Sequence, residues 1–498
     1  MINNNLWKFN RITRSLAEKF GDSNALSDDF ISLTYNELDK ECGILAVKLR
    51  MLGIKKGDII MLGLTNSVYH PVILLALIRI GAIPLLLHTQ LLHHEIEPLI
   101  KLCRPAAWIR DSHFSEEEAD KYNYGGLVLT VGDLKNISVK PAPPVEAECS
   151  LKDTAFLLLS SGSTGTPKCI PKTYGELTVF FNCYIKEMGF TRETRSLVTG
   201  PLSHYLPFII VFGTLLAGGT AFITRFFSPV DIISTVSENN INTAAMVPAM
   251  LRMCINCLDL SQERCVIGEK LIIGGSKMGK DDIQSAIKYF SCSVVLIYGS
   301  SEAIFCISRY NDKSDLDAFS EGTPMYKSDK IKISGSKTTG ELLVKGPYVL
   351  KNYYGMESRK YDYFTSDGYY KTGDLAWIDK NGSVHICGRC TEMINRCGEK
   401  IIPYELEEMI KKHRNIAECA VCGVKDITFG EKIVVFAELK AKDLSYELKD
   451  LKINLSEQGI AEYKLPDELV LMERLPKNAS GKVQKKILIE NYSNGIVS

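Results

Sequence analysis

The stretch from Leu157 to Tyr174, which reads LLLSSGSTGTPKCIPKTY, constrains this chain more than any other. Its apolar run is too short for a helix and ends at a loop of small residues, so it predicts a buried strand. The loop, residues 160–168, offers backbone amides, several hydroxyls and one ammonium group. Amides and a cation in this arrangement replace the water around a polyanion. The stretch therefore predicts a phosphate-binding loop between two strands.

This loop differs from the Walker A motif of phosphate-loop NTPases. That motif runs from Gly-Lys-Ser/Thr directly into a helix, whereas here Pro167 precedes Lys168 and Pro171 follows soon after. Prolines at these positions disfavour a helix start. An ordinary Ser/Gly-rich turn is the other interpretation, but a turn requires neither the hydroxyls nor the lysine.

Composition excludes several classes of function. Lys+Arg and Asp+Glu both number 59 among 498 residues, so the net charge of zero provides no field that would gather nucleic acid or anionic lipid. The N-terminus lacks the basic start and apolar core of a signal peptide. Without such a signal, the fifteen cysteines indicate reduced thiols. We therefore expect a cytoplasmic protein with no nucleic-acid or membrane partner.

Two apolar stretches, 72–87 and 205–224, are interrupted by glycine and proline. Their spacing fits a buried helix, a glycine turn and a buried strand better than a membrane span. The nearest pattern to a metal site is formed by Cys387, Cys390 and Cys397. No further Cys or His completes it at zinc-site spacing, so we expect no metal there.

Helix and strand patterns alternate in the first part of the chain. The expected elements are helices over 10–20, 34–53 and 72–80 and strands over 59–64 and 82–87. Thr34 is the predicted N-cap of the second helix, with Glu37 completing a capping box. The alternation predicts an α/β layered domain with mostly parallel sheets, in which ligands lie at the carboxyl ends of the strands.

Beyond Arg389 the pattern changes. It predicts helices over 404–413 and 446–457 and strands over 417–422, 433–439 and 468–472. About a hundred residues of this kind are enough for a small α+β domain. We therefore expect a large domain over 1–389 and a small mobile one over 390–498.

The loop sequence SSGSTGTPK resembles the nucleotide-phosphate loop of the adenylate-forming superfamily, which includes acyl- and aryl-CoA synthetases, peptide-synthetase adenylation domains and luciferases. The resemblance covers nearly the whole chain, because later motifs follow in the family's order: PLSHYLPF (201–208), GGSK (274–277), YGSSE (298–302), GYYKTGDLAWID (368–379) and GRCTEMINRCGEKIIPYELE (388–407). It implies an AMP-forming ligase that activates a carboxylic acid with ATP and Mg²⁺, releases pyrophosphate and passes the acyl group to a pantetheine thiol of a carrier protein or CoA.

The resemblance also implies roles for single residues. Glu302 would contact Mg²⁺ with Thr164, since Mg²⁺ prefers hard oxygen ligands. Asp374 would accept both ribose hydroxyls, and Lys482 would neutralise charge on the α-phosphate as pyrophosphate leaves. The other implied nucleotide contacts are Ser161, Gly162, Ser163, Gly165, Lys168, Tyr298, Gly299 and Arg389. A core aromatic is the alternative for Tyr298, and a solvated basic run with Lys485 and Lys486 is the alternative for Lys482.

Several local strings, among them PKCIPKTY and RIGAIPLLLHTQ, resemble the aryl-acid AMP ligases that activate salicylate or 2,3-dihydroxybenzoate for siderophore assembly. By this resemblance the acid is lined by His204, Tyr205, Ile210, Gly274, Gly275, Ile297 and Phe305, with His204 beside the carboxylate; a buried structural histidine is the alternative. Those ligases carry asparagine where this chain has Tyr205. An apolar pocket offers no hydrogen bond to a ring hydroxyl, so a less polar aryl acid or a short acyl acid is expected.

Two further readings stay open. One is a short- or medium-chain acyl-CoA synthetase, and the other is a nucleotide- and acid-binding homologue without catalysis. The family's hinge usually carries Asp or Lys two residues after the ribose arginine, and this chain has Thr391. A hinge needs φ/ψ freedom rather than one side chain, so we expect a pivot at Thr391.

Overall fold

The computed structural model describes residues 9–111, 124–138, 145–160, 167–311, 315, 319–335, 338–356, 358, 360–441, 446–477 and 483–497. The chain divides into two compact units. The first comprises Met1–Lys330 and Lys345–Tyr370, and the second comprises Ile331–Val344 and Lys371–Ser498. The expected domain boundary after residue 389 stays a prediction.

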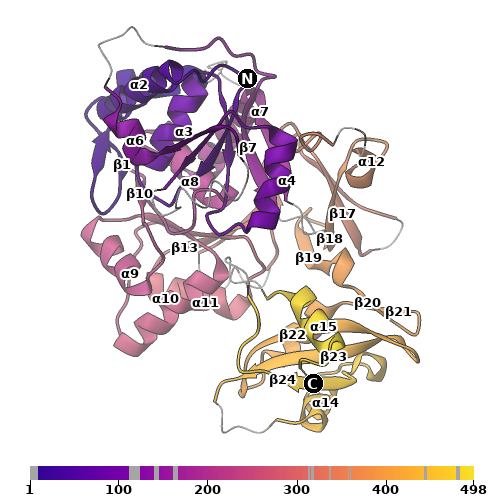
Figure 1. The fold of residues 1–498 in the computed structure, drawn as a ribbon. Helices are drawn as coiled ribbons and strands as arrows, with labels where there is room; N and C mark the ends of the chain where they lie inside the picture. Colours follow the sequence, from indigo (N-terminus) through magenta and orange to yellow (C-terminus); the bar gives the residue numbers. More distant parts are fainter. Residues whose placement is uncertain are drawn as a thin grey trace. The chain divides into compact units, whose positions relative to one another are not determined.

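Two sheets form the frame of the first unit in its described residues (Figure 1). The six-stranded sheet has the order β6-β5-β3-β4-β7-β8, and the nine-stranded sheet has the order β15-β14-β13-β12-β11-β9-β10-β1-β2. Neighbouring strands are parallel except β7–β8, β13–β14, β14–β15 and β1–β2. The strands of the smaller sheet are β3 (Ile59–Gly63), β4 (Ile83–Leu86), β5 (Ala107–Arg110), β6 (Leu127–Thr130), β7 (Thr154–Ser160) and β8 (Lys168–Thr173). Those of the larger sheet are β1 (Asn24–Ser27), β2 (Ser32–Thr34), β9 (Arg195–Val198), β10 (Thr220–Ile223), β11 (Thr243–Met246), β12 (Lys270–Gly274), β13 (Ser293–Ser300), β14 (Ala303–Tyr310) and β15 (Thr323–Pro324).

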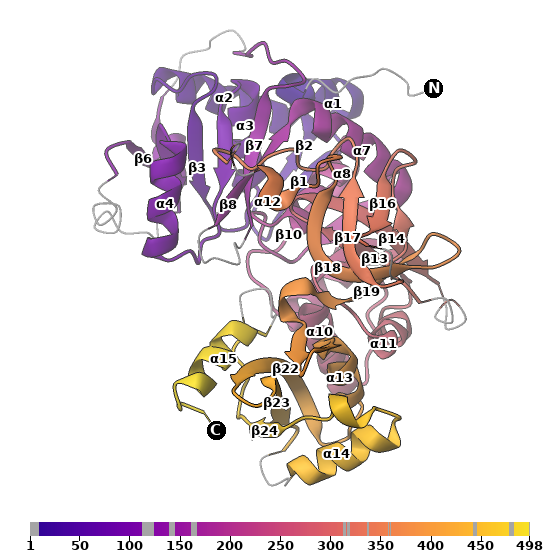
Figure 2. The same ribbon diagram turned by 90° about the vertical axis from the view of Figure 1, so that its right-hand side faces the viewer.

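Helices cover these sheets in layers. They are η1 (Phe9–Arg11), α1 (Ile12–Phe20), α2 (Tyr35–Met51), α3 (Tyr69–Arg79), α4 (His93–Cys103), α6 (Val131–Asn136), α7 (Tyr174–Met188), α8 (Tyr205–Ala217), α9 (Pro229–Glu238), α10 (Pro248–Ser261), α11 (Lys280–Phe290) and α12 (Lys360–Tyr363). Helix α7 contacts β8, α8 contacts β9 and β10, and the two helices contact each other, so they lie between the sheets. Helix α4 packs on the six-stranded sheet (Figure 2). Helices α9, α10 and α11 lie side by side over the nine-stranded sheet (Figure 1).

The structure confirms the α/β fold and several local predictions. Thr34 accepts a hydrogen bond from the backbone N–H of Glu37, and the Glu37 carboxylate accepts one from the backbone N–H of Thr34, which completes the capping box. The 205–224 stretch forms α8, a left-handed turn at Gly218 (φ 93°) and the buried strand β10. A Cβ at Gly218 would lie 2.4 Å from the ring of Phe20, so only glycine fits there. Within the described ranges, no helix is long and apolar enough to cross a membrane.

The second unit contains two further sheets. The four-stranded sheet consists of β16 (Lys330–Ile333), β17 (Gly340–Lys345), β18 (Tyr370–Ile378) and β19 (Val384–Arg389). The five-stranded sheet consists of β20 (Ile394–Arg396), β21 (Glu399–Ile401), β22 (Ile416–Asp426), β23 (Gly430–Leu439) and β24 (Glu468–Leu471). The helices are η4 (Cys390–Glu392), α13 (Pro403–Ile410), α14 (Leu448–Glu457), η5 (Glu462–Lys464) and α15 (Lys485–Ser493). Helices α13 and α14 pack on one apolar core of the five-stranded sheet, and α15 packs on a second core.

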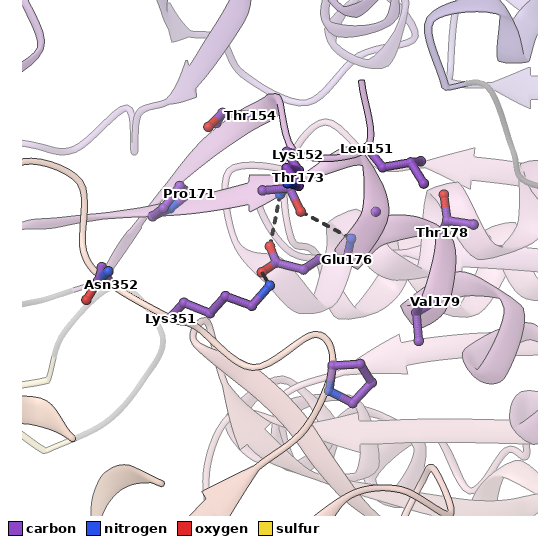
Figure 3. Close-up of a pocket in the computed structure, with 12 residues that line it drawn as sticks. Leu151, Lys152, Thr154, Pro171, Thr173, Glu176, Thr178, Val179, Lys351 and Asn352 are labelled. Atoms are coloured by element: carbon purple, nitrogen blue, oxygen red, sulfur yellow. Dashed lines mark hydrogen bonds and ion pairs between the residues drawn. The ribbon is translucent and has the colours of Figure 1, made fainter. Parts of the chain in front are cut away.

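A capping box joins the end of β8 to the start of α7. The Thr173 hydroxyl accepts a hydrogen bond from the backbone N–H of Glu176 at 3.2 Å, and the Glu176 carboxylate accepts one from the backbone N–H of Thr173 at 3.0 Å. The other oxygen of Glu176 lies 3.3 Å from Nζ of Lys351. These groups lie beside a groove of about 550 Å³ (Figure 3) that is also lined by Pro171. The groove contains none of the site residues predicted from the sequence.

Replacing Thr173 with valine removes this helix cap at nearly constant volume. We expect the free energy of unfolding to fall by about 1 kcal/mol, the usual effect of losing a Ser/Thr N-cap. Urea denaturation measures the change. Thr154→Val is the matched control, because Thr154 lines the same groove and has no side-chain hydrogen bond within the described part of the chain. Equal losses of unfolding free energy in Thr173→Val and Thr154→Val would contradict the role of Thr173 as the cap of α7.

Candidate active site

The hairpin of β7 and β8 places the two ends of the predicted phosphate loop side by side. Ser160 and Lys168 are direct partners across this antiparallel pair. The expected helix-free exit from the loop is confirmed, since β8 begins at Lys168. The predicted contacts Ser161, Gly162, Ser163, Thr164 and Gly165 lie outside the described residues. Their roles, including the metal contact of Thr164, stay predictions.

Lys168 is held by two aromatic rings. Its Nζ lies 4.2 Å from the ring centroid of Tyr363 and 5.1 Å from that of Tyr353. An ammonium over the face of a tyrosine ring is attracted to the negative centre of the ring. The rings therefore orient the ammonium at the end of the loop without neutralising its charge.

Glu302 is a buried carboxylate next to the carboxyl end of β13, with 6% of its surface exposed. Its Oε1 accepts a hydrogen bond of 2.8 Å from the Tyr353 hydroxyl. Its backbone carbonyl accepts hydrogen bonds from the backbone N–H of Leu350 at 3.0 Å and from Nζ of Lys172 at 3.2 Å. No hydrogen bond to its Oε2 is formed by the residues that the structure describes. One hard oxygen thus stays available, which fits a contact to Mg²⁺.

Lys172 is a site residue that the sequence analysis missed. Its side chain is fully buried, contacts Glu302 as described, and lies with Nζ 4.9 Å from the ring centroid of Tyr205. Burial lowers the pKa of Lys172 to about 8, and the negative charges of Glu176 and Glu302 oppose that shift. Strand periodicity could have found it, because Lys172 shares a face of β8 with the buried Ile170.

The adjacent strands β12 and β13 carry the next group of predicted residues. Gly274 at the end of β12 pairs with Ile297 of β13, and a Cβ at Gly274 would lie 3.1 Å from the Ile297 carbonyl oxygen. Gly275 follows with φ +91°, a conformation that favours glycine. Tyr298 is only half-buried and Gly299 is exposed, at an irregular step of the β13–β14 pairing. This partial exposure favours a ligand contact for Tyr298 over the core-aromatic alternative.

Two stacked histidines are His88, which follows β4, and His204, which precedes α8. His204 is the N-cap of α8, and its ring lies 4.0 Å from the ring of His88 at an angle of 27°. Nδ1 of His88 lies 2.8 Å from Oγ of Ser203. Burial lowers the pKa of His88, which keeps this ring neutral at pH 7. His88, just after β4, was also missed, although it ends the apolar string RIGAIPLLLH.

The remaining acid-pocket candidates are buried apolar or aromatic side chains. Ile210, Ile297 and Phe305 are at most 6% exposed. The Tyr205 ring lies 5.8 Å from that of Phe180, and burial raises its pKa, so Tyr205 is a neutral phenol. These side chains agree with the apolar environment that the sequence predicts.

Asp374 and Arg389 form the second cluster of predicted residues, in the second unit. They are cross-strand partners on β18 and β19, and Nε of Arg389 lies 2.9 Å from Oδ1 of Asp374. Arg389 also donates a hydrogen bond of 3.3 Å to the carbonyl of Thr372. The structure thus brings this predicted pair together, as ribose recognition by a carboxylate and a guanidinium requires.

Lys482 lies outside the described residues, and Thr391 lies in η4. The alternative of a solvated basic run is wrong at Lys485, whose Nζ is 2.8 Å from carboxylate oxygens of both Glu392 and Glu407. Burial disfavours this ammonium, but the two carboxylates outweigh burial and raise the pKa of Lys485. The residues that follow Lys482 are therefore anchored to the rest of the second unit.

No group of three or more His, Cys, Asp or Glu side chains that could hold a metal ion occurs in the described ranges. All fifteen cysteines are free thiols, including the Cys387, Cys390 and Cys397 set. A metal at Glu302 would therefore take most of its ligands from bound phosphates and water, which is the usual environment of Mg²⁺.

Two family models match this chain. The model described as AMP-binding enzyme matches residues 13–354, and the one described as AMP-binding enzyme C-terminal domain matches residues 405–482. The first match alone covers more than half of the sequence. The chain therefore belongs to the AMP-binding enzyme family.

Curated relatives and solved structures extend this match. The 2,3-dihydroxybenzoate-AMP ligase of Bacillus subtilis is 28% identical over 516 residues, which cover 98% of this chain and 94% of the relative. Component E of the enterobactin synthase of Escherichia coli is 28% identical, with coverage of 94% and 91%. The o-succinylbenzoate CoA synthetase of Bacillus subtilis, solved with its acyl-adenylate intermediate, has a TM-score of 0.86 and 26% identity, with coverage of 96% and 97%. The predicted superfamily and its aryl-acid resemblance are confirmed.

Replacing Lys172 with methionine should remove one component of the pH dependence of stability. The pKa of Lys172 is about 8 in the folded chain and 10.5 ordinarily, so between these pH values unfolding takes up a proton. In that window wild type should gain stability relative to Lys172→Met as pH rises, by up to about 1.4 kcal/mol per pH unit. Below pH 8 Lys172 is charged in the folded chain, so the cost of burying this charge lowers the stability of wild type by its full amount.

Urea denaturation at pH 7.5, 8.5 and 9.5 measures this difference. The exposed Lys152 supplies the control Lys152→Met, which should follow the wild-type pH dependence. A constant difference between wild type and Lys172→Met across this range would show that Lys172 keeps an ordinary pKa.

Proposed function

We propose that this protein activates a carboxylic acid with ATP to an acyl-adenylate, releases pyrophosphate and transfers the acyl group to a pantetheine thiol of a carrier protein or CoA. The observation that carries the proposal is the cluster at the end of the β7–β8 hairpin, where Tyr353 contacts both Glu302 and Lys168. A fixed carboxylate and a fixed ammonium beside a hydroxyl-rich loop suit a metal-bound polyphosphate. Membership of the AMP-binding enzyme family supports the same chemistry.

The cofactors of the proposal are ATP and Mg²⁺. Glu302 and Thr164 would hold the metal, which neutralises phosphate charge when bound. Ser161, Gly162, Ser163, Gly165 and Lys168 would hold the phosphates. A related o-succinylbenzoate CoA synthetase was solved in complex with ATP and a magnesium ion.

The nucleoside would be held by Asp374, Arg389, Tyr298 and Gly299. In the second unit, the carboxylate of Asp374 can accept from the ribose hydroxyls while Arg389 keeps it oriented. Lys482 would stabilise charge on the α-phosphate, and a pivot at Thr391 would bring it to the site and withdraw it. We also propose that the large domain comprises residues 1–389 and the small mobile domain comprises residues 390–498.

An aryl acid is the proposed substrate. Relatives are named as 2,3-dihydroxybenzoate-AMP ligase and salicylyl-CoA synthase, among others. The buried side chains of Ile210, Ile297 and Phe305 suit an apolar ring. Gly274 and Gly275 would lie beside this ring, and His204 would lie near its carboxylate. Siderophore or secondary-metabolite assembly is the corresponding biological setting. A short- or medium-chain acyl acid is the alternative that an apolar pocket also supports.

The proposed location is the cytoplasm. The fifteen cysteines are all free thiols, and nine of them are buried. Free thiols in this number suit a reducing compartment better than an oxidising one.

Acid-dependent exchange of labelled pyrophosphate into ATP tests the reaction. We expect exchange that needs Mg²⁺ and one or more aryl acids, and we expect Glu302→Gln to lower it by about a hundredfold, the scale of losing one positioned charge. Glu238→Gln, at an exposed position of α9, is the matched control. If ATP binds but no acid in a broad aryl and acyl panel supports exchange, the protein is a binding homologue without catalysis.

Replacing Tyr205 with asparagine tests specificity. Wild type should use benzoate-like acids at least as well as salicylate, because a neutral phenol in an apolar pocket gives a 2-hydroxyl little recognition. Tyr205→Asn should shift the kcat/KM ratio toward the hydroxylated acid. Measuring both acids on each variant cancels general losses of folded enzyme. A wild-type preference for 2,3-dihydroxybenzoate above about a hundredfold would contradict the apolar-pocket account.

A further inference from the structure

The side chain of Tyr353 contacts both Glu302 and Lys168. Its hydroxyl donates to Oε1 of Glu302 at 2.8 Å and lies 3.1 Å from the hydroxyl of Tyr370. Its ring lies 5.1 Å from Nζ of Lys168 and packs edge-on against Tyr363, with centroids 4.8 Å apart. One buried side chain therefore joins the carboxylate, the ammonium and two further tyrosines.

The backbone around Tyr353 makes the same connection. The N–H of Leu350 donates to the carbonyl of Glu302 at 3.0 Å, and the N–H of Tyr354 donates to the carbonyl of Cys169 at 3.0 Å. Cys169 directly follows Lys168 on β8. The segment 350–354 thus bridges the residues next to β13 and the start of β8, two parts of the chain about 130 residues apart in sequence.

Tyr353 remains a hydrogen-bond donor at neutral pH. Only 3% of its surface is exposed. A phenol hydroxyl can donate a hydrogen bond, and here it donates to Oε1 of Glu302 at 2.8 Å. A protonated phenol can fix one oxygen of Glu302 and leave the other to face a ligand.

We propose that Tyr353 is a positioning residue, which orients Glu302 for the metal through its hydroxyl and Lys168 for the phosphates through its ring. The inference rests on the proposed function, because it takes Glu302 as the metal contact and Lys168 as the phosphate contact. Tyr353 itself touches neither the metal nor the reacting atoms. It acts by holding two charged groups in one geometry before ATP arrives.

Two substitutions separate the hydroxyl from the ring. Tyr353→Phe removes the hydrogen bond to Glu302 and keeps the ring beside Lys168, whereas Tyr353→Leu removes both. Losing an outer partner of a metal ligand weakens metal binding by about 10- to 100-fold. We therefore expect Tyr353→Phe to weaken metal binding by about tenfold or more at unchanged affinity for metal-free nucleotide. Tyr353→Leu should weaken the binding of the metal and also the binding of metal-free nucleotide.

The measurement is binding of Mn²⁺ to the full chain in the presence of a non-hydrolysable ATP analogue, followed by electron paramagnetic resonance. Binding of the analogue without metal is measured by calorimetry, and circular dichroism checks that each variant is folded. Tyr184→Phe is the matched control, because Tyr184 is a fully buried tyrosine of the same unit whose hydroxyl has no partner in the described part of the chain. It should leave both affinities unchanged.

The outcomes distinguish the inference from the proposed function. If wild type binds Mn²⁺ with the analogue, Glu302→Gln abolishes that binding and Tyr353→Phe leaves it unchanged, the positioning role is refuted and the proposed function stands. A parallel loss of metal, nucleotide and acid binding in Tyr353→Phe would show a structural role and also refute it. If Glu302→Gln leaves Mn²⁺ binding unchanged, Glu302 does not hold the metal. This outcome refutes the metal role of Glu302 in the proposed function and, with it, the positioning role of Tyr353.

Discussion

A carboxylate that is buried away from water needs hydrogen-bond partners to offset the loss of its hydration, and Glu302 is such a group in the first unit. Glu302 receives a side-chain hydrogen bond from Tyr353, and its carbonyl receives hydrogen bonds from Leu350 and Lys172. Tyr353 and Leu350 lie in one segment and Lys172 lies on β8, whereas Glu302 itself follows β13. Both sheets and the 345–370 segment must therefore be in place before Glu302 has these contacts. Under the proposed function, stability and activity depend on the same contacts.

Much of the fold followed from local pattern. The capping box at Thr34 and the helix, turn and strand over 205–224 depend on neighbouring residues, and the structure confirms them. Element ends were less well predicted. The helix expected over 404–413 ends at Ile410, because the three basic residues that suggested a longer helix lie in the turn that follows.

Site residues could be predicted from the sequence where they lie in a short motif. Glu302 and the Asp374–Arg389 pair were predicted from short strings, and their roles stay predictions. The structure buries Glu302 and pairs Asp374 with Arg389. Lys172 and Tyr353 were missed because their importance lies in contacts with Glu302 that are 130 and 51 residues distant in sequence. A lone lysine in a strand or a tyrosine in a turn gives no local sign of such a partner. Only the assembled sheets show it.

The pairing of Ser160 with Lys168 also limits how this chain can change its length. Alternation along β8 turns Lys172 toward Glu302 and turns Pro171 and Thr173 toward the groove on the other face (Figure 3). Inserting a single residue ahead of β8 and letting the strand slip by one position would reverse every side chain on it. A proline would then occupy the place of the buried ammonium. The register of β8 therefore restricts the number of residues that the loop can contain.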